Sequence, residues 1–286
     1  MNMYKSLYTY FFLLIAIPLI SQENGHLISK TPIPRDTLLH AFAAFPNPER
    51  FVVAEGPSLR WNDDWQHLDS LNLFDITYLS DGFKVKGYLL EPRASGKHPC
   101  VIFNRGGNRS FGMLTPVRIA FLGGKLASHG YVVIASNYRG VDGGEGMEEF
   151  GGADVNDVLN LIPALGQTEK ADTSRIGMYG WSRGGMMTYL ALTRTDRIKA
   201  AVVGGAVSDN FETIRERPDM ETHVLAELIP DYAASKEAAL TERSAIHWAD
   251  RFPKNVPVLM LHGNADWRVK STQSLRLALE FEKHRI

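Results

Sequence analysis

Short apolar runs alternate with longer amphipathic stretches from about residue 73 onward. Residues 74–79 and 83–90 alternate in polarity around Ser80-Asp81-Gly82, which predicts a hairpin. Farther on, apolar runs predict buried strands, and the stretches between them have helical periodicity. The strands are expected at residues 100–103, 131–136, 176–179, 200–203 and 258–261, and the helices at 118–129, 153–165 and 184–193. This pattern predicts an α/β fold with a mostly parallel, doubly wound sheet and a ligand site beyond the carboxyl ends of its strands.

The preceding residues 22–72 are mixed in pattern and are interpreted as an N-terminal extension. A short helix is expected over residues 36–45, and residues 31–34 are predicted to be a linker. Trp61, Trp65 and Leu68 recur at helical spacing, which predicts a face that packs on the main domain.

Residues 1–21 have the three-part pattern of a secretory signal peptide. Lys5 precedes an apolar run over residues 7–20, and polar residues follow from Ser21. The run is shorter than the roughly 20 apolar residues that cross a bilayer, although an uncleaved anchor remains an alternative. We therefore expect an exported protein, periplasmic or extracellular, with no membrane attachment after signal removal and with residues 73–286 as its catalytic domain.

The composition narrows the range of functions. The 286 residues are 44% hydrophobic and carry a formal net charge of -1, so a large core is possible and no nucleic-acid partner is indicated. Cys100 is the only cysteine, which excludes an intramolecular disulfide, and it lies in an apolar run where a buried thiol is expected. No histidine pair has metal-ligand spacing and no glycine-rich phosphate loop is present, so neither a metal nor a cofactor is expected.

The strongest motif is Gly-Trp-Ser-Arg-Gly at residues 180–184, between a predicted strand and a predicted helix. This is the context of a nucleophile elbow, in which a sharp turn exposes the serine hydroxyl and glycines on either side prevent collisions. Ser182 is thus the predicted nucleophile, and the N–H of Arg183 is a predicted oxyanion donor. The alternative is an ordinary strand-to-helix turn with a capping serine.

Two further loops have the expected positions for a serine hydrolase. Asp266 follows a late strand downstream of the serine, in the chain order Ser…Asp…His of α/β-hydrolases. Asp209 is the competing acid, and a helix-capping role is the alternative for Asp266. The loop that begins at Asn104 contains Gly106, whose N–H is the predicted second oxyanion donor, with a plain tight loop as the alternative. Arg105 is expected either to bind a substrate carboxylate or to be solvated.

Taken together, residues 73–286 resemble the catalytic domain of the prolyl oligopeptidase family of serine peptidases. The resemblance rests on the hairpin and on residues 131–140, 149–158, 180–185 and 262–266. It implies an α/β-hydrolase fold and acyl transfer to water through a serine ester, usually on peptides. Many members carry a β-propeller before this domain, and the residues before the hairpin are too few for one. Many members also use a tyrosine as oxyanion donor near the place where Arg105 stands.

The resemblance also implies a histidine after the acid, on a loop beyond one more strand. Ile286, the last residue, follows Asp266 by only twenty positions, and His284 is the only histidine between them. It ends a predicted helix, so we do not expect it to be the base; His262 is expected to pack near a strand end. The last strand, the histidine loop and the final helix of the fold are therefore expected to be absent, as in a fragment.

The sequence thus predicts a serine peptidase-like hydrolase that cleaves peptide or aminoacyl bonds with Ser182 and Asp266. A carboxylic or acetyl ester hydrolase with the same chemistry is one alternative, and an inactive fragment or binding module is another. Residues 211–251, between the last two strands, are expected to form a cap over the pocket. The expected partner is a small peptide or ester substrate.

Overall fold

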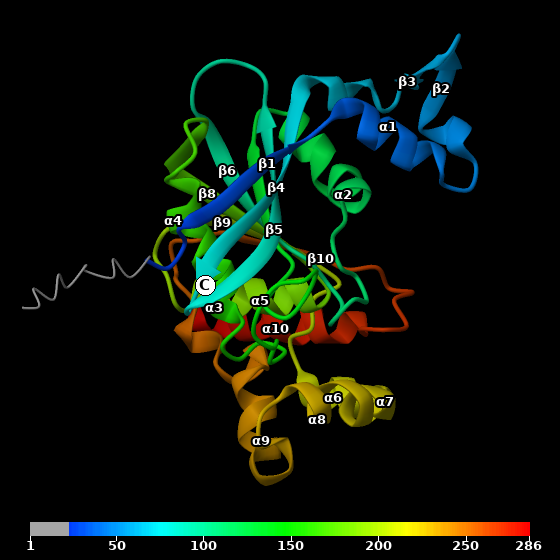
Figure 1. Ribbon diagram of the computed structural model, residues 1–286. Helices are drawn as coiled ribbons and strands as arrows, with labels where there is room; N and C mark the ends of the chain where they lie inside the picture. Colours follow the sequence, from blue (N-terminus) through cyan, green and yellow to red (C-terminus); the bar gives the residue numbers. More distant parts are fainter. Residues whose placement is uncertain (1–22) are drawn as a thin grey trace, which may run out of the picture.

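The computed structural model describes residues 23–286, so the predicted signal peptide lies outside the described residues. Within them, one large sheet has the strand order β1-β4-β5-β7-β6-β8-β9-β10 (Figure 1). These strands are β1 (Leu27–Ile33), β4 (Leu71–Ser80), β5 (Phe83–Pro92), β6 (His98–Asn104), β7 (Val132–Ser136), β8 (Ala171–Trp181), β9 (Ile198–Gly204) and β10 (Val258–Leu261). The five that follow the hairpin run parallel, which confirms the predicted doubly wound sheet.

The hairpin of β4 and β5 is confirmed as well. Ser80 pairs with Phe83 across a two-residue turn. Asp81 and Gly82, the residues between them, have φ angles of 51° and 84°. Positive φ at both positions matches the turn to the right-handed twist of the strands, and Asp-Gly tolerates it well.

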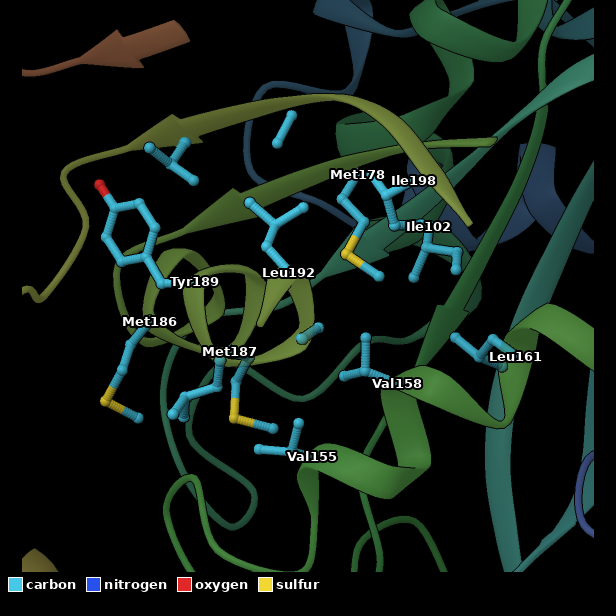
Figure 2. Packing of buried hydrophobic residues seen from close by; sticks show 14 of the residues in the cluster. Ile102, Val155, Val158, Leu161, Met178, Met186, Met187, Tyr189, Leu192 and Ile198 are labelled. Carbon is cyan, nitrogen blue, oxygen red and sulfur yellow. The ribbon is translucent and has the colours of Figure 1, made fainter. Parts of the chain in front are cut away.

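Helices cover both faces of the sheet. One face holds α2 (Pro116–Ser128), and the other holds α3 (Val155–Leu159), α4 (Leu161–Leu165), α5 (Arg183–Leu192) and α10 (Ser271–His284). Successive residues of a strand point into the cores on opposite faces of the sheet. Ile102 belongs to the core under α3 and α5, and Phe103 to the core under α2. Figure 2 shows Ile102 and Met178 pointing from the sheet toward Val158 of α3.

The single helix predicted for residues 153–165 is instead divided into α3 and α4. Pro163 lies in the first turn of α4, where its missing N–H is tolerated. A continuous helix would need that N–H to donate to the carbonyl of Leu159, so the chain ends one helix and starts the next at Asn160.

The predicted linker at residues 31–34 is wrong, because residues 27–33 form the edge strand β1, antiparallel to β4. Pro32 is compatible with an outermost strand, since its missing N–H need not interrupt a ladder on the solvent side. The short helix predicted next is present as α1 (Arg35–Ala43).

The helical spacing predicted for Trp61, Trp65 and Leu68 is also wrong, although their predicted packing is confirmed. Trp61 ends β3 (Ser58–Trp61), which pairs with β2 (Val52–Glu55) beyond the 3₁₀ turn η1 (Pro48–Arg50), and Trp65 precedes a second such turn, η2 (Gln66–Ser70). Trp61 and Leu68 are buried in the core under α2, and the ring centroid of Trp65 lies 5.4 Å from that of Phe121.

A set of short helices connects β9 to β10 and projects from one end of the sheet (Figure 1). It comprises α6 (Asn210–Glu216), α7 (Pro218–Met220), the π-helical turn η3 (Glu221–Leu225), α8 (Ala226–Leu228), α9 (Tyr232–Glu242), η4 (Ala245–His247) and η5 (Ala249–Arg251). This segment, the cap, corresponds to residues 211–251 of the prediction. In the described part of the chain, no helix has both the length and the apolar character needed to cross a bilayer.

A buried ion pair joins the hairpin, the loop after β7 and α3. The Asp157 carboxylate accepts hydrogen bonds from Arg139 Nη2 at 2.7 Å, the Arg139 N–H at 2.8 Å and Ser80 Oγ at 2.7 Å. Arg139 also pairs with Asp81, at 2.8 Å. Because Asp157 is fully buried, removal of its charge would leave the buried Arg139 guanidinium with Asp81, a partly exposed carboxylate, as its remaining ion-pair partner among the described residues.

We expect Asp157→Asn to lower the free energy of unfolding by about 3 kcal/mol, as for other broken buried pairs. Urea denaturation measures the change. Asp36→Asn is the matched control, since that side chain is 84% exposed and its change is expected to be within about 0.5 kcal/mol. Equal stability of the two variants would contradict a structural role for the pair.

Candidate active site

Ser182 lies on the turn between β8 and α5, with φ 56° and ψ −122°. Residues other than glycine rarely adopt this backbone conformation, and strain of this kind occurs frequently at functional sites. The Ser182 N–H donates to the carbonyl of Gly204 at 2.8 Å, which ties the turn to the end of β9. The strand, sharp turn and helix that the motif predicts are therefore all present.

Glycine is required on both sides of this turn. A Cβ atom on Gly180 would lie 2.2 Å from the carbonyl oxygen of Gly184. One on Gly184 would lie 1.9 Å from the carbonyl oxygen of Asn104, in the neighbouring strand end. One on Gly185 would lie 2.3 Å from Ala206 Cβ. The motif glycines thus allow the turn, the helix and the loop after β6 to come into direct contact.

Two backbone N–H groups lie beside Ser182 without a protein acceptor among the described residues. Arg183 is the first residue of α5, so its N–H has no intrahelical partner. The Gly106 N–H, on the loop after β6, also donates to no described protein atom. Gly106 lies close to the serine, since a Cβ placed on it would be 3.2 Å from Ser182 Cβ. The structure therefore places both predicted oxyanion donors next to Ser182.

Both expectations for the Arg105 side chain are wrong. It is 1% exposed, so it is neither solvated nor open to a substrate carboxylate. Its guanidinium instead donates to backbone carbonyls around the loop, namely those of Asn137, Gly106, Phe111 and Arg109. Burial lowers the pKa of Arg105 to about 10, with a further contribution from the charge of Arg183. Arg105 is thus an internal support of the loop.

The Arg183 side chain, which the sequence did not single out, anchors the turn in a buried charge cluster. Its Nη1 lies 2.5 Å from Glu148 and 3.0 Å from the Gly107 carbonyl, and its Nη2 lies 2.5 Å from Asp154. Burial opposes the charge, but the two carboxylates outweigh it and raise the pKa of Arg183. Glu148 also accepts the Arg109 N–H, so one carboxylate holds both the Ser182 turn and the loop after β6.

Asp266 lies on the loop after β10 and faces the same cavity as Ser182. One carboxylate oxygen accepts the N–H groups of Arg268 and Val269, at 2.9 and 3.1 Å. The other is the nearest atom to a Cβ placed on Gly205, at 3.1 Å, which positions it at the end of β9. Ser182, Asp266 and Gly106 together line a cavity of about 420 Å³.

The competing acid, Asp209, has a structural role. It caps α6 by accepting the Glu212 N–H at 3.1 Å, and it pairs with Arg276 at 3.1 Å. It does not line the cavity that Ser182 and Asp266 share.

Among residues 23–286, no histidine lines that shared cavity. His262 packs near the strand end as predicted, with Nδ1 at 2.7 Å from Ser274 Oγ and Nε2 at 2.8 Å from the Val269 carbonyl. His284 is exposed at the end of α10. His223 lines a neighbouring hollow that reaches Ser182, and its exposed ring lies 4.0 Å from Glu227.

This neighbouring hollow lies between Ser182 and the cap, with a volume of about 210 Å³. Met220 and Val224 line it from the cap, and Val207 from the loop after β9. Arg109, on the loop after β6, reaches the cap, where its Nη2 lies 2.5 Å from Glu227 Oε2. Residues of the cap line this hollow but not the cavity that Ser182 shares with Asp266, so a cap over that cavity stays a prediction.

Comparisons with known proteins show the family to which this chain belongs. The sequence profile of the prolyl oligopeptidase family matches residues 121–285. The uncharacterized peptidase YtmA of Bacillus subtilis is 35% identical over 208 residues, which cover 72% of this chain and 78% of YtmA. The solved structure of a puromycin-hydrolyzing peptidase from Mycobacterium tuberculosis is 28% identical, with a TM-score of 0.62, over 82% of this chain and 36% of that one.

An acylaminoacyl peptidase solved with a chloromethyl ketone, Z-Gly-Gly-Phe-chloromethyl ketone, is 25% identical with a TM-score of 0.64. The match covers 82% of this chain and 39% of the peptidase, so this chain spans little more than a third of the length of these solved structures. The fold and these similarities define a serine peptidase-like hydrolase of the α/β-hydrolase class. The chain belongs to the prolyl oligopeptidase family.

We expect Gly184→Ala to lower the free energy of unfolding by about 3 kcal/mol, because the new methyl group would overlap the Asn104 carbonyl. Thermal or urea unfolding measures the loss. Gly263→Ala is a suitable control, since a Cβ at that position would meet no atom within 4 Å. If both alanines are tolerated equally, the contact between α5 and the β6 loop is looser than the structure indicates.

Proposed function

We propose that this protein hydrolyses peptide or aminoacyl bonds through an ester on Ser182. The observation that carries the proposal is the strained Ser182, which shares one cavity with Asp266 and with Gly106, whose N–H has no acceptor among residues 23–286. Ser182 Oγ attacks the acyl carbon while a base takes its proton, and the carbonyl oxygen becomes an oxyanion. The N–H groups of Gly106 and Arg183 stabilise that oxyanion. The proton then passes to the leaving amine, the C–N bond breaks, and water hydrolyses the resulting ester.

In this proposal Asp266 orients the base and stabilises its protonated form. Asp266 is suited to this role because backbone N–H groups of Arg268 and Val269 hold one of its oxygens in place. The space between Ser182 and Asp266 is lined by other side chains but by no described histidine. A base supplied from outside residues 23–286 would enter there.

The named relatives support a peptide or aminoacyl substrate, since YtmA is described as a peptidase and the solved neighbours as puromycin-hydrolyzing and acylaminoacyl peptidases. An ester would pass through the same steps with an alcohol as leaving group. The signal-like sequence of residues 1–21 supports a site of action outside the cytoplasm.

The first test is labelling with a fluorophosphonate probe, followed by hydrolysis assays. We expect the probe to modify Ser182 and Ser182→Ala to abolish labelling while the variant unfolds at the same temperature. Aminoacyl anilides and a short-chain nitrophenyl ester, assayed side by side, separate a peptidase from an esterase. A correctly folded protein that is not labelled, alongside a serine hydrolase that is, would point to an inactive fragment or a binding module instead.

Added imidazole is expected to accelerate the labelling of Ser182, because the cavity of about 420 Å³ between Ser182 and Asp266 admits a ring of that size. The labelling rate is measured against imidazole concentration at pH 8, where imidazole is mostly the neutral base. Asp266→Asn should remove most of the gain, since it no longer stabilises the imidazolium. A gain that survives this substitution would show that imidazole acts without the aspartate.

A further inference from the structure

The orientation of one peptide group decides whether the Gly106 N–H faces the substrate. In a trans peptide the C=O and the following N–H point in opposite directions. The Gly106 N–H therefore faces the site only while the Arg105 carbonyl faces away from it. Rotation of this one peptide would remove a donor and present an oxygen in its place.

The Arg105 carbonyl is held on the buried side. It accepts a hydrogen bond from the hydroxyl of Tyr138 at 3.0 Å. It also packs against Gly184, where an added Cβ would lie 2.7 Å from this oxygen. Gly106, in turn, lies against Ser182 and lines the shared cavity.

Tyr138 is itself fixed. It is fully buried, has a φ of 64°, and its N–H donates to Ser136 Oγ at 2.9 Å. The guanidinium carbons of Arg105 and Arg183 each lie 4.9 Å from the centroid of its ring, a cation–π distance. Burial raises the pKa of the Tyr138 hydroxyl, so the group keeps its proton and donates at every pH at which the enzyme would work.

We propose that Tyr138 is a positioning residue whose hydroxyl holds the Arg105–Gly106 peptide so that the Gly106 N–H points to the oxyanion. This inference rests on the proposed role of Ser182. Tyr138 does not touch the reacting atoms, because it acts only through the carbonyl on the far side of the peptide.

Tyr138→Phe removes the hydroxyl and keeps the ring between the two guanidinium groups. The Arg105 carbonyl then lacks its donor, and the hydrogen bond that favours the present orientation of the peptide is lost. Since loss of one oxyanion donor lowers kcat by about 100- to 1,000-fold, we expect a partial loss, about 10- to 100-fold, in kcat and in the rate of fluorophosphonate labelling. KM should change little, because the donor acts mainly in the transition state.

Tyr189→Phe is the matched control. Tyr189 is also fully buried, on α5 (Figure 2), and its hydroxyl has no hydrogen-bond partner among the described residues. This variant should retain the wild-type kcat and labelling rate. Unfolding temperatures of both variants show whether either effect is merely structural.

Crystal structures of both variants provide a readout that needs no turnover. We expect the Arg105–Gly106 peptide to be rotated or in two orientations in Tyr138→Phe alone. An unrotated peptide, or a labelling rate equal to that of the control, overturns the proposal. If the wild-type protein itself is not labelled, the proposed function fails, and the peptide orientation alone then decides what Tyr138 does.

Discussion

The close approach of the Ser182 turn to the end of β6 is the constraint on which the rest of the site depends. Only glycine at position 184 lets the two backbones meet, because a Cβ there would lie 1.9 Å from the Asn104 carbonyl oxygen. Glycine at position 180 lets the turn itself close against Gly184. The contact fixes Ser182 in its strained conformation and places Gly106 beside it. The turn follows β8, which lies beside β6 inside the sheet. The core under α5 therefore stabilises the Ser182 turn.

A buried cluster of four charged side chains then holds the loops that the glycines bring together. Arg105 and Arg183 are balanced by Glu148 and Asp154, and all four side chains are almost wholly inaccessible. Such a cluster costs desolvation, which its hydrogen bonds must offset. Its members hydrogen-bond to backbone carbonyl and N–H groups of the loop after β6. The cluster therefore holds the peptide groups of that loop in their orientation.

Much of the fold could be predicted from sequence because buried parallel strands are continuous apolar runs. The Ser182 turn could be predicted because the glycines of its motif are the residues that such a sharp turn requires. The linker prediction at residues 31–34 failed because an edge strand tolerates the prolines that usually mark loops. The split at Asn160 depended on one missing N–H. Arg105 was misjudged because nothing local distinguishes a surface arginine from one that meets four carbonyls brought together only by the fold.

The pattern Gly-x-Ser-x-Gly leaves two positions open, and the second of them lies between the serine and the last glycine. Here Arg183 fills it, and its partners Glu148 and Asp154 lie on a distant loop. Replacement of any one of the three leaves buried charge without its full set of partners, so each single substitution is expected to destabilise the protein. An engineer who replaces Arg183 must therefore redesign Glu148 and Asp154 in the same step.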